Sequence, residues 1–396
     1  MAKHFALFDG TDTAGNTGLW VTNGTAAGKF ELTGISGANT GGLSPRDLTV
    51  FNGEVPFAGV DTALNTGLWV TNGTAAGELT GISGAFTGGV SPFNLTTPVK
   101  DDLTGFGLSD LLWQNGTTFT AWFSIGNSFV PNVVVGSVAS GWSLQGTGDF
   151  TGNGISDLLW FNSEAGVFSI WDSTRIGFTP NSFVGSVGAG WRPVAIADFN
   201  GDHASDLLWQ NGTTFTEWQS TGNGFTPNVY VNSVGAGWNL VGTGDFTGNG
   251  MADLVWQNGT TFSVWNSTGN GFTPNSFVGS VDPGWTLCGV GDFTGSGMDD
   301  LVWFNSGTEA FSIWNSNGSG FTPNSFVGSV APGWTLCGTG DYNGDGRADL
   351  MWRNTTTGTF SEWQSNGSGF TPNVYVNTVT TDWTLQCCPR NCCPGA

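Results

Sequence analysis

A stretch of roughly fifty residues is repeated six times in this chain. Each copy opens on an acidic loop, and successive loops begin 47 or 49 residues apart, at Asp102, Asp149, Asp198, Asp245, Asp292 and Asp341. A fixed period in this range is typical of solenoids, arrays and propellers. The repeat therefore constrains the architecture before any local pattern is considered.

Within one copy, β-branched and aromatic residues form four short runs that are separated by turn signals. In the copy that follows Trp191, these runs cover residues 192–197, 207–210, 214–219 and 228–234. No segment has the periodicity of a helix. Four short antiparallel strands in each repeat predict an all-β chain whose units are the blades of a β-propeller.

The first hundred residues carry a second repeat with the same period. Residues 18–28 recur unchanged at 67–77, an offset of 49 residues. Because the two repeat types share a period, we expect them to form one ring. The first unit lacks its first strand, whereas residues 382–386 look like a first strand with no unit after it. Pairing this strand with the first blade, near residues 5–9, would remove two open sheet edges.

The sequence thus predicts a single propeller of eight four-stranded blades over residues 1–386, with seven blades as the alternative, and a Cys-rich tail at 387–396. The tail cysteines could bind a soft metal, form disulfides or have no function. The expected blades cover residues 4–36 plus 383–386, 47–86, 93–138, 142–187, 191–234, 238–281, 285–330 and 334–379.

The charge balance excludes some classes of partner. The chain has 30 acidic and 9 basic residues and a net charge of −21. Nucleic acids and anionic membranes both need a basic surface, so we expect neither as a partner. No hydrophobic run approaches the length of a membrane span, and the first ten residues show no secretory signal, which leaves the export route open.

The acidic loops are candidate metal sites. In the loop from Asp341 to Asp349, oxygen-bearing side chains occupy positions 1, 3, 5 and 9, and Gly346 occupies position 6. This is the spacing by which the EF-hand loop wraps Ca²⁺, here without flanking helices or a bidentate glutamate. Oxygen ligands without His or Cys favour Ca²⁺ over zinc or copper. The alternative is a hydrogen-bonded Asx turn that holds no metal.

The six loops are not equal as calcium sites. The loops at Asp341 and Asp198 have three carboxylates, three further loops have two, and the loop at Asp102 has Phe106 at position 5 and should not bind. The candidate ligands are Asp341, Asn343, Asp345 and Asp349; Asp198, Asn200, Asp202 and Asp206; Asp149, Thr151, Asn153 and Asp157; Asp245, Thr247, Asn249 and Asp253; and Asp292, Thr294, Ser296 and Asp300.

The tryptophans form three repeated sets. We expect the sets in the second and third strands to fill the core between blades. The first-strand set follows a turn, where an indole can be half-exposed and could stack on a sugar. Trp383 completes this first set at the end of the chain. The candidate glycan-binding residues are Trp142, Trp191, Trp238, Trp285 and Trp334.

These motifs resemble known families. The six units from Asp102 to Val379 resemble the FG-GAP/VCBS repeat family, whose repeat reads Asp-Phe-Asn-Gly-Asp-Gly-x-x-Asp-Leu. The first hundred residues resemble the Leu-Trp-x-Thr-Asp-Gly-Thr repeats of secreted bacterial proteins. Gly-Trp followed by an acidic loop is similar to the repeat of the Psathyrella velutina type lectins. The last resemblance implies a calcium-containing propeller that binds N-acetylglucosamine and sialic acid between blades.

We expect no enzyme activity. The only histidines, His4 and His203, are far apart, and the acidic pairs recur in every unit, unlike the single distinctive pair of a glycosidase. The leading interpretation is an extracellular or cell-surface bacterial protein that binds Ca²⁺ and binds glycans multivalently. Two alternatives stay open: a surface scaffold or adhesion module for a cell-surface protein, and an accessory module of a polysaccharide-degrading enzyme.

Overall fold

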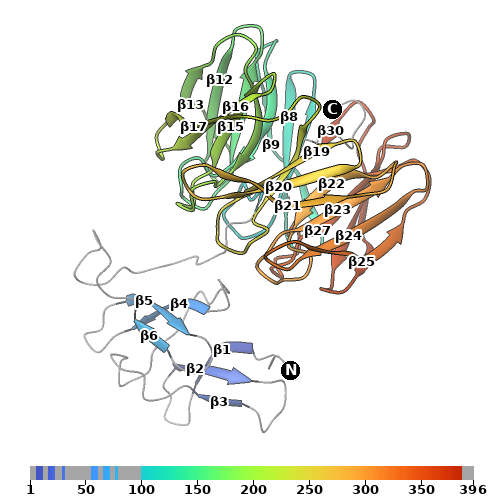
Figure 1. Cartoon of the computed structure of the whole chain (residues 1–396). Coiled ribbons are helices and arrows are strands. Elements are labelled where there is room, and N and C mark those ends of the chain that lie inside the picture. The colour runs from blue at the N-terminus through green and yellow to red at the C-terminus, as the bar shows by residue number, and fades with distance from the viewer. Residues whose placement is uncertain are drawn as a thin grey trace. The chain divides into compact units, whose positions relative to one another are not determined.

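The computed structural model describes residues 100–385 and six short strands within the first hundred residues (Figure 1). The chain divides into two compact units, Met1–Thr97 and Pro98–Ala396. In the first unit, two antiparallel sheets of three strands each repeat one pattern. Their strands are β1 (Ala6–Thr11), β2 (Thr17–Thr22) and β3 (Lys29–Glu31), then β4 (Val55–Val60), β5 (Thr66–Thr71) and β6 (Ala76–Glu78).

The second unit is a propeller of six four-stranded antiparallel sheets, which we name blades A to F. Blade A contains β10 (Ser143–Gly148), β11 (Asp157–Asn162), β12 (Val167–Ser173) and β13 (Phe178–Ser186). Blade B contains β14 (Arg192–Ala197), β15 (Asp206–Asn211), β16 (Thr214–Ser220) and β17 (Phe225–Ser233). Blade C contains β18 (Asn239–Gly244), β19 (Asp253–Asn258), β20 (Thr261–Ser267) and β21 (Phe272–Ser280).

Blades D to F continue the ring with the same four-strand order. Blade D contains β22 (Thr286–Gly291), β23 (Asp300–Asn305), β24 (Ala310–Ser316) and β25 (Phe321–Ser329). Blade E contains β26 (Trp334–Gly340), β27 (Asp349–Asn354), β28 (Thr359–Ser365) and β29 (Phe370–Thr378). Blade F contains β30 (Thr384–Leu385), β7 (Leu111–Asn115), β8 (Thr118–Ser124) and β9 (Phe129–Ser137).

The predicted number of blades is wrong, because the ring has six blades and not eight or seven. The predicted closure is wrong as well. The last strand, β30, pairs with β7, placing Thr384 opposite Gln114 and Leu385 opposite Trp113. All six blades come from residues 100–385, so the two sheets of the first unit are not blades of this ring and a single ring over 1–386 is not formed.

The physical reason is that blade F has no first strand with the Gly-Trp pattern next to its own acidic loop. The C-terminal strand supplies the outer part of that missing strand. Nearer the loop, the backbone N–H of Asp110 donates to the carbonyl of Asp101 at 2.9 Å, so the residues just before the loop supply the remainder. The sequence contains six first-strand tryptophans, counting Trp383, and six acidic loops. This equal number was the signal in the sequence that could have indicated six blades.

Aromatic side chains fill the seams between blades, as predicted for the second-strand tryptophans. These six indoles are at most 1% exposed: Trp113, Trp160, Trp209, Trp256, Trp303 and Trp352. Each packs on a phenylalanine of the preceding blade. Phe119 lies 5.3 Å from Trp160 between ring centroids, and Phe360 lies 5.2 Å from Trp113 and so joins blade E to blade F. Each such pair contributes about 0.5–1.5 kcal/mol beyond the burial of its area.

The third-strand tryptophans are less uniformly buried. Trp122 and Trp265 are 7% exposed, whereas the other four are half-buried. The described residues contain no helix that is long and apolar enough to cross a membrane.

Candidate functional site

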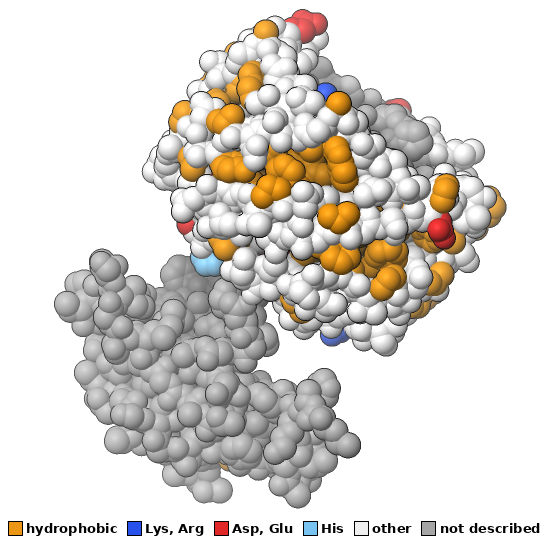
Figure 2. Space-filling model, viewed as in Figure 1, with side chains coloured by type: hydrophobic (Ala, Val, Ile, Leu, Met, Phe, Trp, Pro, Cys, Tyr) orange, Lys and Arg blue, Asp and Glu red, His pale blue; other side chains and the backbone are white. Residues whose placement is uncertain are grey.

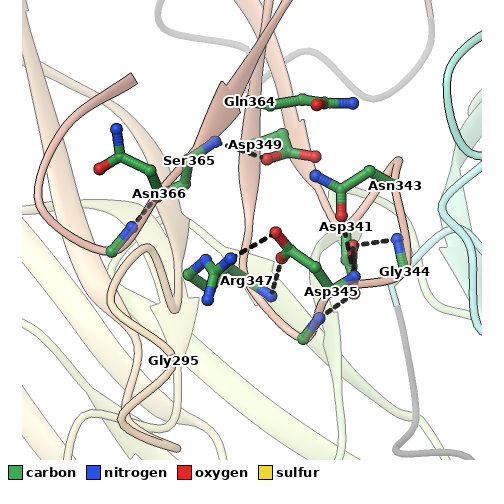
Figure 3. A network of polar contacts seen from close by, with 12 residues as sticks. Gly295, Asp341, Asn343, Gly344, Asp345, Arg347, Asp349, Gln364, Ser365 and Asn366 are labelled. Atoms are coloured by element: carbon green, nitrogen blue, oxygen red, sulfur yellow. Dashed lines mark hydrogen bonds and ion pairs between the residues drawn. The ribbon is translucent and has the colours of Figure 1, made fainter. Parts of the chain in front are cut away.

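Each acidic loop is held in shape by its first aspartate, which accepts hydrogen bonds from the loop's own backbone. Asp341 Oδ1 accepts from the N–H of Gly344 at 2.7 Å, and its Oδ2 accepts from Gly346 at 2.9 Å (Figure 3). The loop at Asp102 makes the same two bonds, to Gly105 and Gly107, both at 2.7 Å. This is the arrangement expected of an Asx turn, and it recurs in loops with strong and weak calcium motifs alike.

The ninth loop position ties the loop to the blade behind it. Asp349 Oδ2 accepts from the N–H of Tyr342 at 3.2 Å, and Oδ1 accepts from Ser365 on the third strand at 2.8 Å. All six aspartates at this position are at most 2% exposed. Burial, opposed by the backbone hydrogen bonds, raises the pKa to about 8 for Asp110, Asp206 and Asp349, and to about 7 for Asp157, Asp253 and Asp300.

The third and fifth positions are also engaged within the loop. Asn343 Oδ1 accepts from the N–H of Asp345 at 2.8 Å, and Asp345 Oδ2 forms an ion pair with the guanidinium of Arg347 at 2.6 Å. In blade B, Asn200 Nδ2 donates to Asp202 Oδ2 at 2.9 Å. The three weaker loops have the same two kinds of hydrogen bond. At position 3, the threonine hydroxyl donates to the first aspartate of the loop (Thr151, Thr247 and Thr294). At position 5, the side-chain oxygen accepts from the backbone N–H two residues later (Asn153, Asn249 and Ser296).

No three His, Cys, Asp or Glu side chains converge as a metal-binding group anywhere in the described parts of the chain. The predicted ligands of each loop lie close together along the backbone, but their oxygens accept hydrogen bonds from N–H and O–H groups of the loop and of the third strand. Because a carboxylate oxygen has two lone pairs, these bonds leave acceptor capacity for a cation. The calcium assignment stays a prediction.

Neighbouring loops are joined in a continuous belt around the ring. The serine that ends each third strand donates its hydroxyl to a carbonyl in the loop of the preceding blade. Ser365 Oγ donates to the Phe293 carbonyl at 2.6 Å, and Ser124 Oγ closes the belt by donating to the Tyr342 carbonyl at 2.6 Å. These serines were missed in the sequence, although Trp-x-Ser occurs in all six third strands.

The first-strand tryptophans all occupy the same environment. Each is half-buried and packs on a hydrophobic cluster shared by two neighbouring blades. The glycine before each of the five predicted tryptophans has a positive φ and lies against the asparagine that ends the second strand. At Gly237 (φ 86°), a Cβ would approach Asn258 Nδ2 to 3.1 Å. Trp383, which is preceded by Asp382, is the sixth first-strand tryptophan and packs on the core of blades E and F. The assignment of glycan binding to the other five stays a prediction.

Comparison with known proteins identifies the repeat in two stretches of the chain. The family model of the FG-GAP-like repeat matches residues 149–209 and 292–352. The chain carries FG-GAP-like repeats. No curated protein matches the chain in sequence.

Solved structures resemble the FG-GAP-like propeller in fold at low identity. One is an Agrocybe aegerita lectin solved for its recognition of non-reducing terminal N-acetylglucosamine, with 17% identity, a TM-score of 0.47 and coverage of 82% of this chain and 88% of the lectin. Another is the Photorhabdus luminescens Tc holotoxin pore, with 20% identity, a TM-score of 0.42 and coverage of 78% of this chain and 17% of the toxin chain.

Two of the six blades differ from the others in the seam that they form with the next blade. Blades B and E place Glu217 and Glu362 on their third strands, and both side chains are fully buried. The equivalent residues in the other blades are apolar: Ala121, Ile170, Val264 and Ile313. The sequence shows this exception to the repeat, and we did not predict a role for it.

Proposed function

We propose that the protein is a non-enzymatic, calcium-binding propeller that binds glycans at several equivalent positions around its ring. The observation that supports this function is the half-buried indole found at the same place in every blade, from Trp142 to Trp383. One part of each ring packs on a blade core and the rest remains accessible.

The surroundings of each indole suit a sugar. An aromatic face stacks on the apolar face of a pyranose, and nearby amides and backbone groups orient the hydroxyls. In the blade B–blade C region, Trp238 lies next to Gly237, which in turn packs on the Asn258 amide. Each site would be weak, but identical sites on one rigid ring gain avidity without any new contact.

A glycan array, followed by retention on a column of the best sugar, tests the proposal. Trp238→Phe should reduce retention, and Trp142→Phe/Trp238→Phe/Trp334→Phe should reduce it more. Val278→Ala, on the exposed outer strand of blade C, is the matched control and should not change it. If the parent protein binds nothing across a broad panel that includes N-acetylated sugars, glycan binding is excluded.

A protein-binding scaffold is the second candidate, because the outermost strands expose apolar side chains. A valine at the same position of each outer strand is 51–63% exposed: Val135, Val184, Val231, Val278, Val327 and Val376. Hydrophobic side chains are also visible over the propeller surface in Figure 2. A scaffold should fail on the array yet bind cells after deglycosylation. An accessory module of a polysaccharide-degrading enzyme should instead bind extended polymer and not terminal sugars.

We also propose that the protein acts outside the cell or on its surface, in a bacterium. Weak calcium sites are filled at the high calcium levels found there. Fractionation of the source organism with an antibody against the propeller tests this location. Recovery in the cytoplasmic fraction alone would contradict it.

A further inference from the structure

Two cysteines lie at the same position on the first strands of neighbouring blades. Cys288 is on β22 of blade D, and Cys337 is on β26 of blade E. Both side chains are buried. Blades A, B and C have Gln145, Val194 and Val241 at this position, so the fold of a blade does not require a cysteine there.

The two cysteines are in different chemical states. Cys337 carries a thiol, which donates to the Met351 carbonyl at 3.2 Å and whose pKa is raised to about 12 by burial. Cys288 is disulfide-bonded. Because Cys337 is a thiol, the two residues are not bonded to each other. The chain has four further cysteines, and all of them lie in the tail: Cys387, Cys388, Cys392 and Cys393.

Burial excludes a partner from a second molecule. Cys288 is 1% exposed and packs with Leu336 and Trp352 in the hydrophobic cluster between blades D and E. The Cα atoms of a disulfide lie about 4.4–6.8 Å apart, so the backbone of the partner must come equally close to this buried position. A separate folded chain cannot do this without displacing a blade.

β30, the last strand before the tail, ends at the level of the ring at which Cys288 lies. First strands of successive blades lie beside one another, as β22 does with β18 on one side and β26 on the other. In the repeat, residues 383–385 correspond to residues 285–287. The residue after β30 therefore corresponds to Cys288, and Cys387 follows it.

The distance from the end of β30 to Cys288 is short. Leu385 packs in one cluster with Cys337, and the residue before Cys337, Leu336, packs in one cluster with Cys288. Only blade E therefore separates the two ends, and packed sheets lie about 10 Å apart. A chain spans at most about 3.3–3.6 Å per residue, so the eight residues from 386 to 393 can reach about 26–29 Å. The tail is long enough to bridge from blade F to blade D.

We propose that Cys288 forms its disulfide with a cysteine of the tail, and that this bond locks the closed ring. The loop that it closes contains all of blade E and β30. Blade D is thereby tied covalently to the strand that completes blade F, so closure does not depend on the two residues of β30 alone. A bond that closes a loop of about 100 residues strongly restricts the unfolded chain and stabilises the folded ring.

Formation of this bond is a two-electron oxidation. The two thiols lose two protons and two electrons, and a low-molecular-weight disulfide such as oxidised glutathione takes them up and leaves as two thiols. Disulfides form and persist in oxidising surroundings such as those outside a cell. Neither glycan binding nor calcium binding is needed for the bond.

Non-reduced peptide mapping of the full chain, refolded with oxidised and reduced glutathione, tests the partner. The protein is unfolded at mildly acidic pH with N-ethylmaleimide, which blocks thiols, and is then digested with trypsin and Asp-N protease. Cleavage before the aspartates and after Arg390 places Cys288, Cys337 and the two pairs of tail cysteines on separate peptides, which cover residues 282–291, 300–340, 382–390 and 391–396.

Peptide 282–291 should be joined to 382–390 or to 391–396, and reduction should separate them. The mass of the joined peptides identifies the pair of tail cysteines that supplies the partner. Peptide 300–340 should carry one N-ethylmaleimide group on Cys337. The proposal is wrong if peptide 282–291 carries N-ethylmaleimide itself, or if it is joined to 300–340 or to a second copy of 282–291.

Thermal melts with and without reductant test the lock. Cys288→Val introduces the residue that blades B and C have at this position, so it should give the near-ultraviolet circular dichroism of the parent. Reductant should lower the melting temperature of the parent by about 5 °C or more and leave that of Cys288→Val unchanged. Cys337→Val is the matched control and should respond to reductant like the parent. A Cys288→Val protein that responds as strongly as the parent would show that this disulfide does not lock the ring.

Discussion

At the scale of single residues, one buried aspartate per blade holds the acidic loop in place. Asp110 shows this best, because its loop is not a predicted calcium site. Its Oδ1 accepts from Ser124 N–H and its Oδ2 from Leu103 N–H, both at 2.8 Å. Burial raises its pKa to about 8, against an ordinary value of about 3.9 in an unfolded chain. The folded protein therefore binds the proton more tightly than the unfolded protein does.

This difference gives a pH prediction with a fixed sign. Because the folded pKa of Asp110 is the higher one, its contribution to stability is most favourable below about pH 4 and is lost as the pH rises towards about 8. In Asp110→Asn this dependence is absent. The stability advantage of the parent over the variant, measured by denaturant unfolding in chelator, should therefore shrink between pH 5 and pH 8. An advantage that stays constant or grows would contradict the raised pKa.

A second residue-scale prediction concerns Cys337. Its thiol is 0% exposed, and burial raises its pKa to about 12. Since the thiolate is the reactive form, the folded protein should resist alkylation at this residue at pH 8. Peptide mapping after iodoacetamide treatment should find Cys337 modified only when guanidinium is present. Fast modification in native buffer would show that the seam between blades E and F opens readily.

At the scale of elements, the ring is closed by a two-residue strand. Leu385 is 1% exposed and packs in the core shared by blades E and F. Arg353 of β27 supports the closure from the side: its guanidinium lies 5.1 Å from the Trp113 ring centroid and donates to the Thr380 carbonyl at 3.3 Å. The equivalent residues in the other blades are Gln or Phe, so this contact belongs to the closing seam alone.

Deleting the chain from Asp382 should therefore damage blade F first. Hydrogen exchange should accelerate at the β7 amides, while the β2 and β5 amides keep their parental rates. Loss of the buried Leu385 side chain alone costs about 2–5 kcal/mol, so the melting temperature should also fall by several degrees. Val135→Ala, exposed on β9 of the same blade, is the matched control. Faster exchange in β1 or β2 would favour closure through the N-terminal unit.

The elements were largely predictable from the sequence, and their assembly was not. Alternating apolar residues and turn signals, Asn-Gly among them, give each blade its four strands, and the second-strand tryptophans were expected in the core. The predicted blade count is wrong because the shared period of the two repeat types placed the N-terminal units in the ring. The predicted closure is wrong because the unmatched strand near Trp383 was assigned to a gap at the other end of the chain. The loops are ambiguous for a different reason: the spacing of Asp341, Asn343 and Asp345 serves a hydrogen-bonded turn as well as a calcium site.

At the scale of the whole molecule, the propeller should be an independent folding unit. Residues 98–396 form one compact unit with a continuous belt of loop contacts. Expressed alone, this segment should unfold cooperatively and reproduce the tryptophan circular dichroism of the full chain. The comparison is a thermal melt of both proteins at equal ionic strength. A segment that aggregates or lacks a cooperative transition would show that the first 97 residues are needed for folding.

Calcium should stabilise this unit as a whole. A ligand that binds only the folded state adds about 2.7 kcal/mol at a hundredfold excess over its Kd. The melting temperature of residues 98–396 should therefore be higher in Ca²⁺ than in chelator, and magnesium should have less effect because it demands a stricter octahedral geometry. Identical melts in Ca²⁺ and chelator would leave the hydrogen-bonded turn as the complete description of the loops.

The split first strand of blade F also determines at which stage of synthesis the open sheet edge, which favours aggregation, can be covered. Asp101 and Leu385 belong to one strand position, yet the ribosome makes almost the whole propeller between them. Until β30 arrives, β7 has an open edge and Trp113 lacks its cover. Such long-range pairing is slow to form and exposes apolar surface while it is incomplete. A nascent chain stalled anywhere before residue 384 is thus an open arc with an exposed sheet edge, and the ring is complete only once β30 has been made.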